Sequence, residues 1–186
     1  EVLVIDDDSP DGTSKIVNSY IQKSDGVVSF RVHTRKGKRG LSSAVIYGIN
    51  LAHGKFVLVM DSDFSHPPQM ISTMYDELVN NELDIVVGSR YVEGGNDERD
   101  KLRSFASKFL NWIYQFALSK EIKDYTSGMF VMKRNVLLKA IPNCFGHGEF
   151  FVEFVYRAYK RGSKIFEVPF IQPPDLEKRS KTAPSI

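Results

Sequence analysis

Two aspartates that follow an uninterrupted apolar run are the residues of this chain best suited to chemistry. Residues 56–60 (Phe-Val-Leu-Val-Met) are all apolar, as in a strand buried on both faces, and Asp61 and Asp63 follow. If the extended conformation persists to Asp63, both carboxylates point to the same side. Converging carboxylates repel each other unless a cation lies between them. The cation at such a site is commonly Mg²⁺ or Mn²⁺, and it usually also binds a phosphate. The alternative is a pair of loop acids that caps the next helix, which begins near Ser65 or His66.

The apolar pattern of the rest of the chain predicts the elements that position these carboxylates. Strands are expected at residues 2–5, 27–32, 56–60, 84–88, 126–132 and 165–171. Helices are expected at residues 13–23, 41–52, 70–79, 103–118 and 149–160. This alternation predicts an α/β protein with a mostly parallel sheet flanked by helices, in which ligands bind at the carboxyl ends of the strands. Pro169 in the last strand predicts that it lies at an edge, and Gly128 predicts a close approach of backbone.

Three segments have distinctive compositions. Residues 93–101 are polar and contain glycine, which predicts a mobile loop, and residues 172–186 show no packing pattern, which predicts a mobile tail. The predicted helix 103–118 has a broad aromatic side that includes Trp112 and is flanked by Arg103 and Lys108. That side suits either a membrane interface or the core, and we favour the core for most of its residues.

The composition limits the possible classes of protein. The chain has 186 residues, of which 42% are hydrophobic, which is enough for one sizeable core. Its net charge of +2 is too small to argue for nucleic acid binding. A single cysteine, Cys144, excludes an internal disulfide and fits a reducing compartment. No apolar run reaches the length of about 18 residues that a transmembrane helix needs.

Several motifs occur in an order that resembles one family of enzymes. DDDSPDGT, RKGKRGLSSAVIYGINLAHG, DSDFSHPP, GSRY, YTSG and SKT together resemble the inverting nucleotide-sugar glycosyltransferases of the GT-A type. The most similar group is the dolichol-phosphate (polyprenol-phosphate) mannosyltransferases. The resemblance extends from Glu1 to about Thr182. It implies the GT-A (nucleotide-diphospho-sugar transferase) fold, with a Rossmann-like sheet whose N-terminal strand is missing here.

The resemblance also implies roles for individual residues in donor binding. Asp61 and Asp63 match the DXD motif, which anchors the ribose and the metal-bound diphosphate, and Ser65 matches a weaker metal ligand. Arg90 matches an arginine that donates two hydrogen bonds to phosphate oxygens. The other residues expected in the donor site are Asp6, Asp7 and Lys38. The alternative for Asp6 and Asp7 is that they are turn acids satisfied by nearby backbone N–H groups.

The acceptor phosphate is expected to bind Arg103 and Ser107, one helical turn apart, together with Ser180 and Lys181. A solvated helix face is the alternative for Arg103 and Ser107. The catalytic residues implied are Asp63, Arg90 and Arg103. Residues 1–171 are expected to form the catalytic domain, with a nucleotide-binding half over 1–91 and an acceptor half over 92–171.

The implied reaction moves a hexose onto dolichyl or polyprenyl phosphate, with inversion and with Mg²⁺ or Mn²⁺, and mannose from GDP-mannose is the favoured donor. The enzyme would act in the cytoplasm, peripherally at the cytoplasmic face of a membrane, with a membrane-anchoring partner or a lost membrane segment. Three alternatives stay open: another donor such as UDP-glucose, a haloacid-dehalogenase-like phosphatase with an aspartyl nucleophile, and a non-catalytic nucleotide-sugar-binding module. A Rossmann dehydrogenase is disfavoured because no G-x-G-x-x-G follows a strand.

Overall fold

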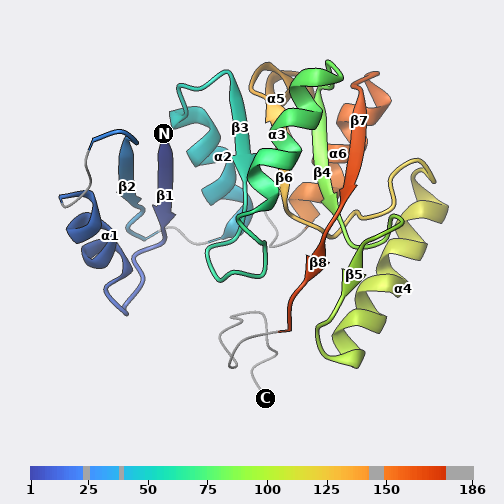
Figure 1. Cartoon of the computed structure of the whole chain (residues 1–186), viewed down its shortest axis with the longest axis horizontal. Helices are drawn as coiled ribbons and strands as arrows, with labels where there is room; N and C mark the ends of the chain where they lie inside the picture. Colours follow the sequence, from blue (N-terminus) through green and yellow to red (C-terminus); the bar gives the residue numbers. More distant parts are fainter. Residues whose placement is uncertain (23–25, 38–39, 143–148, 175–186) are drawn as a thin grey trace.

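The fold is built from fourteen helices and strands in the part of the chain that the structure describes, residues 1–22, 26–37, 40–142 and 149–174 of a computed structural model (Figure 1). The strands are β1 (Val2–Asp6), β2 (Phe30–Thr34), β3 (Phe56–Val59), β4 (Ile85–Ser89), β5 (Asn96–Asp97), β6 (Phe130–Lys133), β7 (Ile165–Pro169) and β8 (Ile171–Gln172). The helices are α1 (Thr13–Ile21), α2 (Leu41–Leu51), α3 (Met70–Asn80), α4 (Lys101–Ala117), α5 (Asn135–Ala140) and α6 (Glu149–Lys160). Among these described helices, none has the length and apolar character needed to cross a membrane.

The central sheet is mixed rather than mostly parallel. Its four strands lie in the order β3-β6-β4-β7, and β6 runs antiparallel to both β3 and β4. Strands β4 and β7 are parallel, and two further parallel pairs, β1–β2 and β5–β8, form separate small sheets. The predicted edge position of Pro169 is confirmed because β7 ends the strand order. Strand β6 comes from the predicted acceptor half and lies between two strands of the predicted nucleotide-binding half, so the two halves share one sheet.

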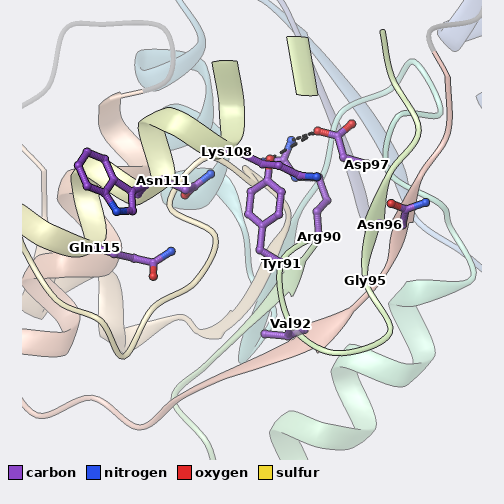
Figure 2. A pocket seen from close by; sticks show the side chains of 10 residues that line it. Arg90, Tyr91, Val92, Gly95, Asn96, Asp97, Lys108, Asn111 and Gln115 are labelled. Carbon is purple, nitrogen blue, oxygen red and sulfur yellow. Dashed lines mark hydrogen bonds and ion pairs between the residues drawn. The ribbon is translucent and has the colours of Figure 1, made fainter. Parts of the chain in front are cut away.

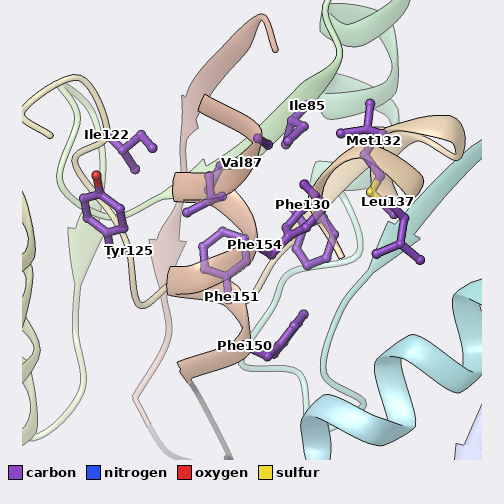
Figure 3. Packing of buried hydrophobic residues seen from close by; sticks show 14 of the residues in the cluster. Ile85, Val87, Ile122, Tyr125, Phe130, Met132, Leu137, Phe150, Phe151 and Phe154 are labelled. Carbon is purple, nitrogen blue, oxygen red and sulfur yellow. The ribbon is translucent and has the colours of Figure 1, made fainter. Parts of the chain in front are cut away.

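The hydrophobic core lies on both faces of this sheet, and alternate residues of the central strands face opposite helices. Ile85, Val87, Phe130 and Met132 pack with the buried side chains of α5 and α6 on one face (Figure 3). Val86 and Val131 pack against Met74 and Leu78 of α3 on the other face. This period of two places helices on both sides and makes the α/β layers that the sequence predicted.

The strand predicted to be buried on both faces is only half-buried. Every residue of β3 has intermediate exposure, because β3 lies at the edge of the sheet opposite β7. Strand β4 is instead buried along its whole length. An apolar run therefore marked the strand correctly but did not give its position in the sheet.

Several predicted boundaries were wrong at segments where turns and pairing decide the structure. Residues 93–101, expected to be a loop, contain β5, which pairs with β8. Gln172, assigned to the tail, lies in β8 and is buried, whereas residues 175–186 of that tail lie outside the described residues. The strand predicted at 126–132 begins only at Phe130, because Gly128 adopts a left-handed φ of 75°. This conformation, rather than close approach of another backbone, requires glycine there, since an added Cβ would meet only the His66 ring at 3.9 Å.

Candidate active site

Three chain segments meet at one end of the central sheet. The parallel strands β3 and β4 end there, followed by Asp61 and Arg90 respectively. Because β6 is antiparallel and pairs Phe130 with both Val59 and Val87, the loop that precedes β6 also lies at this end. The sheet thus brings together the DXD turn after β3, the arginine after β4 and the residues 124–128 before β6.

A buried histidine holds the DXD turn against that loop. The backbone N–H of Asp61 donates to Nδ1 of His66 at 2.9 Å. His66 Nε2 lies 3.1 Å from the carbonyl oxygen of Ser127 and, since Nδ1 accepts a bond, carries the proton that it donates there. The ring is buried and packs edge-to-face on Phe170. His66 therefore ties the end of β3 to the segment before β6.

The two carboxylates of the motif have opposite electrostatic environments. Although about half of its side chain is exposed, desolvation of Asp61 by the surrounding protein and the negative charge of Asp63 raise the pKa of Asp61. Partial burial opposes ionisation of Asp63, but hydrogen bonds from Ser65 outweigh it and lower the pKa of Asp63. Phe64, between Asp63 and Ser65, adopts a left-handed φ of 64°, which is unusual for a bulky residue. The turn is thus a strained segment that holds two mutually repelling acids.

These two acids fit a divalent cation that also binds phosphate. In the described part of the chain, no group of three or more His, Cys, Asp or Glu side chains is arranged to hold a metal ion. Mg²⁺ is commonly bound by one or two protein carboxylates and completes its ligands with water and substrate phosphates. The side chain of Asp61 is about half exposed, as such a shared ion requires. Ser65, predicted as a weak ligand, donates its backbone N–H to Asp63 Oδ1 at 3.0 Å.

The sequence suggested that the guanidinium of Arg90 binds phosphate. In the structure, this guanidinium is bonded to other protein groups. Its Nε donates to Asp124 Oδ2 at 2.8 Å, and its Nη2 donates to Asp124 Oδ1 at 2.7 Å. Further bonds run from Nη1 to Gln172 Oε1 at 2.9 Å and from Nη2 to Thr126 Oγ1 at 2.7 Å. Arg90 and Asp124 are both buried. In this structure Arg90 joins the end of β4 to the loop before β6 and to β8.

A second ion pair extends this network to the start of α4. Asp97 in β5 accepts bonds from Arg99 at 2.8 and 2.7 Å, and Nη1 of Arg90 lies 3.8 Å from the same carboxylate. Arg99 also donates to Ser107 at 2.8 Å, so the hydroxyl predicted to bind the acceptor phosphate is already held. Arg103, its predicted partner, is half-buried one turn earlier on the same helix. Asp100 caps α4 by accepting from the N–H of Leu102 at 2.7 Å, which occupies part of the predicted anion site.

A cavity of about 350 Å³ lies between α4 and the segment that follows β4 (Figure 2). Its wall on the α4 side includes Lys108, Asn111 and Trp112, and its opposite wall runs from Arg90 to Asp97. Asn111 is fixed by bonds to Ser107, Thr126 and Tyr125. The cavity is separate from the carboxylates of the DXD turn, since neither Asp61 nor Asp63 lines it.

The acidic pair after β1 is engaged within the protein. Asp6 is buried and accepts from the backbone of Ser9 and the hydroxyl of Ser14. Burial opposes its ionisation, but these hydrogen bonds outweigh burial and lower the pKa of Asp6. Asp7 accepts from Arg35 Nε at 2.6 Å and from the Gly40 N–H at 3.0 Å. The contacts of Asp6 are those of the turn-acid alternative, whereas Asp7 holds Arg35 and Gly40 in place. Lys38, Ser180 and Lys181 lie outside the described residues.

Some of the residues that hold this site together were not among the site residues predicted from the sequence. His66 lies in the motif DSDFSHPP and Asp124 directly precedes the motif YTSG, and each is a polar residue close to an apolar strand. Burial of such a residue requires hydrogen-bond partners, and that requirement was the available signal. Asp97 and Gln172 carried no comparable signal, because they lie in segments whose pattern predicted mobility.

Comparison with known proteins identifies the family. The model of the family described as glycosyl transferase family 2 matches residues 1–140. A dolichol-phosphate mannosyltransferase from Pyrococcus furiosus is 37% identical over 173 residues, which cover 91% of this chain and 47% of that protein. A polyprenol monophosphomannose synthase from Mycolicibacterium smegmatis is 35% identical over 181 residues, which cover 90% of this chain and 64% of that protein. The chain thus spans about half the length of the first relative and under two thirds of the second.

Solved structures show the same fold at lower sequence identity. A mannosyltransferase from Pyrobaculum calidifontis, solved with GDP-Man and Mn²⁺, superposes with a TM-score of 0.67 at 16% identity, over 97% of this chain and 49% of that one. A mycobacterial protein superposes with a TM-score of 0.70 at 16% identity, over 97% of this chain and 58% of that one. The fold is therefore GT-A, and the chain belongs to glycosyl transferase family 2.

Proposed function

We propose that this protein transfers mannose from GDP-mannose to a polyprenyl phosphate, with inversion and with Mg²⁺ or Mn²⁺. The observation that carries the proposal is the DXD turn, which places two carboxylates at the carboxyl end of β3 and whose backbone is held by buried His66. The names of the two relatives support the mannosyl donor and the lipid acceptor. The family argues against the phosphatase alternative, and the place of the motif after the third strand, rather than the first, does so as well.

In this mechanism Asp61 and Asp63 would hold the divalent cation. When bound, the cation would supply positive charge that stabilises the leaving diphosphate. The nucleophile is an oxygen of the acceptor phosphate, which is ionised near neutral pH, so no general base is needed. Both carboxylate oxygens of Asp124, the acid next to Arg90, accept hydrogen bonds from the guanidinium, which fits a structural role for this acid.

The site residues take partly different roles from those first expected. Arg90 acts as a positioning residue that fixes the loop before β6 and β8. Arg103, with Ser180 and Lys181, orients the acceptor phosphate, and Arg99 holds Ser107 at the same helix turn. Asp6 and Asp7 shape the nucleotide side through the turns that they stabilise, and Lys38 contacts the donor. The protein acts peripherally at the cytoplasmic face of a membrane, where the lipid acceptor is found.

Calorimetric titration with GDP-mannose, in the presence and absence of Mn²⁺, tests the proposal. We expect Asp63→Asn to reduce the Mn²⁺-dependent affinity by at least about tenfold, since an ion with so few protein ligands depends heavily on each. Asp76→Asn, the same change at an exposed position of α3, is the matched control and should bind as the wild type does.

Three results would contradict parts of the proposal. Equal Mn²⁺-dependent affinity in Asp63→Asn would remove the metal from this turn. Tighter Mn²⁺-dependent binding of UDP-glucose than of GDP-mannose would change the donor. Donor binding without transfer to polyprenyl phosphate would make the chain a nucleotide-sugar-binding module.

A further inference from the structure

The cavity between α4 and the segment after β4 opens to solvent beside an exposed cation. Lys108 and Trp112 line it from α4, and both side chains are exposed, Trp112 by 63%. Tyr91 and Val92 line it from the opposite side and are half-buried (Figure 2). Most aromatic residues of α4 are more than half exposed, which contradicts the prediction that they pack in the core. The cavity is therefore an accessible site with aromatic groups on both of its walls.

The charges around the cavity leave a positive excess. Its lining contains two cationic side chains, Arg90 and Lys108, and one acidic side chain, Asp97. Asp97 is itself neutralised, because Arg99 donates to its two carboxylate oxygens at 2.8 and 2.7 Å. Lys108 forms no ion pair with any of the described residues. An anionic group of a ligand would therefore find an unpaired ammonium at this site.

Lys108 is also better placed for a phosphate than the other polar groups nearby. The Ser107 hydroxyl, predicted to bind the acceptor phosphate, accepts a hydrogen bond from Arg99 at 2.8 Å. The guanidinium of Arg90 is bonded to three other side chains. An ammonium offers three donors, and its charge-assisted hydrogen bonds to phosphate oxygens are stronger than neutral ones. Of the cations that line the cavity, Lys108 is thus the one that a phosphate can use.

The cavity lies next to the proposed donor site without overlapping it. Its wall starts at Arg90, which follows β4 at the same end of the sheet as the DXD turn. Neither Asp61 nor Asp63 lines the cavity, so a diphosphate held at these acids leaves it to a second substrate. A polyprenyl phosphate combines an anionic group with an apolar chain, which matches the unpaired ammonium and the aromatic walls.

We propose that this cavity binds the head of the acceptor, with Lys108 as a further substrate-binding residue. The phosphate pairs with the Lys108 ammonium, and the first carbons of the apolar chain lie between Tyr91 and Trp112. The proposal rests on the proposed function, because that function makes a polyprenyl phosphate the acceptor. It adds Lys108 and Trp112 to the residues expected to contact this substrate.

Trp112 reports on occupancy of the cavity, because it is the single tryptophan of the chain. The probe is geranyl phosphate, a short alkyl phosphate, titrated without donor and below the concentration at which it forms micelles. We expect a saturable change in Trp112 emission. Geraniol, which lacks the phosphate, and inorganic phosphate, which lacks the chain, should each bind at least about tenfold more weakly.

Two substitutions at Lys108 and one matched control test its role. Lys108→Met removes the charge but keeps the length of the side chain, and it should weaken binding of geranyl phosphate by about tenfold. Lys108→Arg keeps a cation and should retain most of the affinity. Lys101→Met makes the same change at an exposed position of α4 that does not line the cavity, and it should bind as the wild type does. In transfer from GDP-mannose with Mn²⁺, Lys108→Met should raise the KM for geranyl phosphate with little change in kcat.

Several results would overturn the proposal. Unchanged affinity of Lys108→Met would remove Lys108 from the site, and equal losses in Lys108→Met and Lys101→Met would reduce its effect to overall charge. Geraniol that binds as tightly as geranyl phosphate would remove the anionic group, and inorganic phosphate that does so would remove the apolar contact. Displacement of geranyl phosphate by GDP with Mn²⁺ would place the donor diphosphate in the cavity instead.

The proposed function can fail independently of this site. Binding of geranyl phosphate that depends on Lys108, without transfer of mannose, would refute the proposed function and leave the alkyl phosphate site in place. Transfer of mannose with the same KM for geranyl phosphate in Lys108→Met and the wild type would do the reverse.

Discussion

Arg90 binds both carboxylate oxygens of Asp124, at 2.8 and 2.7 Å, in a buried ion pair that joins β4 to the loop before β6. The pair places a charged network directly behind the proposed site. Breaking a buried ion pair from one side is strongly destabilising because the remaining charge stays buried. Arg90 should therefore affect stability as well as transfer.

Arg90→Lys keeps the positive charge but cannot reproduce the fork that meets Asp124, Gln172 and Thr126 together. We expect it to lower the free energy of unfolding by about 2 to 3 kcal/mol, measured by urea denaturation. Arg99→Lys should lose less stability, because the side chain of Arg99, which pairs with Asp97, is more exposed than that of Arg90. A stability of Arg90→Lys equal to that of the wild type would show that the ion pair is not formed in solution.

His66 offers two conservative substitutions that separate its two hydrogen bonds. In His66→Asn the new amide oxygen can take the place of Nδ1, which accepts from Asp61. In His66→Gln the new amide nitrogen can instead take the place of Nε2, which reaches Ser127. If the bond to Asp61 fixes the DXD turn, His66→Asn should keep more of the Mn²⁺-dependent affinity for GDP-mannose than His66→Gln. Both should lose about 1 to 3 kcal/mol of stability, because each leaves one buried group unpaired. Equal affinities in calorimetry would assign His66 to packing alone.

Phe64 holds a left-handed backbone conformation with an exposed side chain. Glycine relieves this strain, and alanine removes the ring but keeps the strain. We expect Phe64→Gly to be about 1 kcal/mol more stable than Phe64→Ala in thermal or urea unfolding. Two variants of equal stability would mean that the turn relaxes out of the left-handed region.

Asp6 should make stability depend on acidity. Its folded-state pKa lies below the usual 3.8, so the native protein holds its carboxylate ionised where the unfolded chain binds a proton. This contribution is fully present well above pH 3.8 and is lost as the pH falls through 3.8 toward the lowered value. Asp6→Asn should cost about 1 to 2 kcal/mol at neutral pH and flatten the fall in stability on acidification. Chemical denaturation at a series of pH values measures both, and Asp8→Asn, at a more exposed position of the same turn, is the control.

The sequence predicted this fold where local patterns decide the structure. Apolar runs located β1, β3 and β4, and the helical spacing located α2, α3 and α6 within a few residues. The motif at Asp61 and Asp63 was correctly placed at the carboxyl end of a strand. These features depend on neighbours in the chain, so the pattern of residue types was sufficient.

Contacts between distant segments were not predictable in the same way. Nothing in residues 130–133 indicates that β6 runs antiparallel between β3 and β4, because strand order depends on pairing with other segments. The partner of Arg90 was also missed, since a forked cation after a strand suits a phosphate and a carboxylate equally. The side of helix α4 that faces the protein was predicted wrongly. Its aromatic residues have the spacing of a core helix, but the hydrogen bonds of Asn111 place the polar side against the protein.

The place of β6 in the sheet also has a consequence for the order in which the protein assembles. During synthesis β3 and β4 leave the ribosome well before β6, yet within the described residues β6 is the only strand that pairs with β3. A nascent chain that ends before residue 130 therefore has β3 without its partner β6 and β4 without either of its partners, β6 and β7, and unpaired strand edges favour aggregation. These edges gain their native partners only when the second half is made and β6 and β7 pair with β3 and β4.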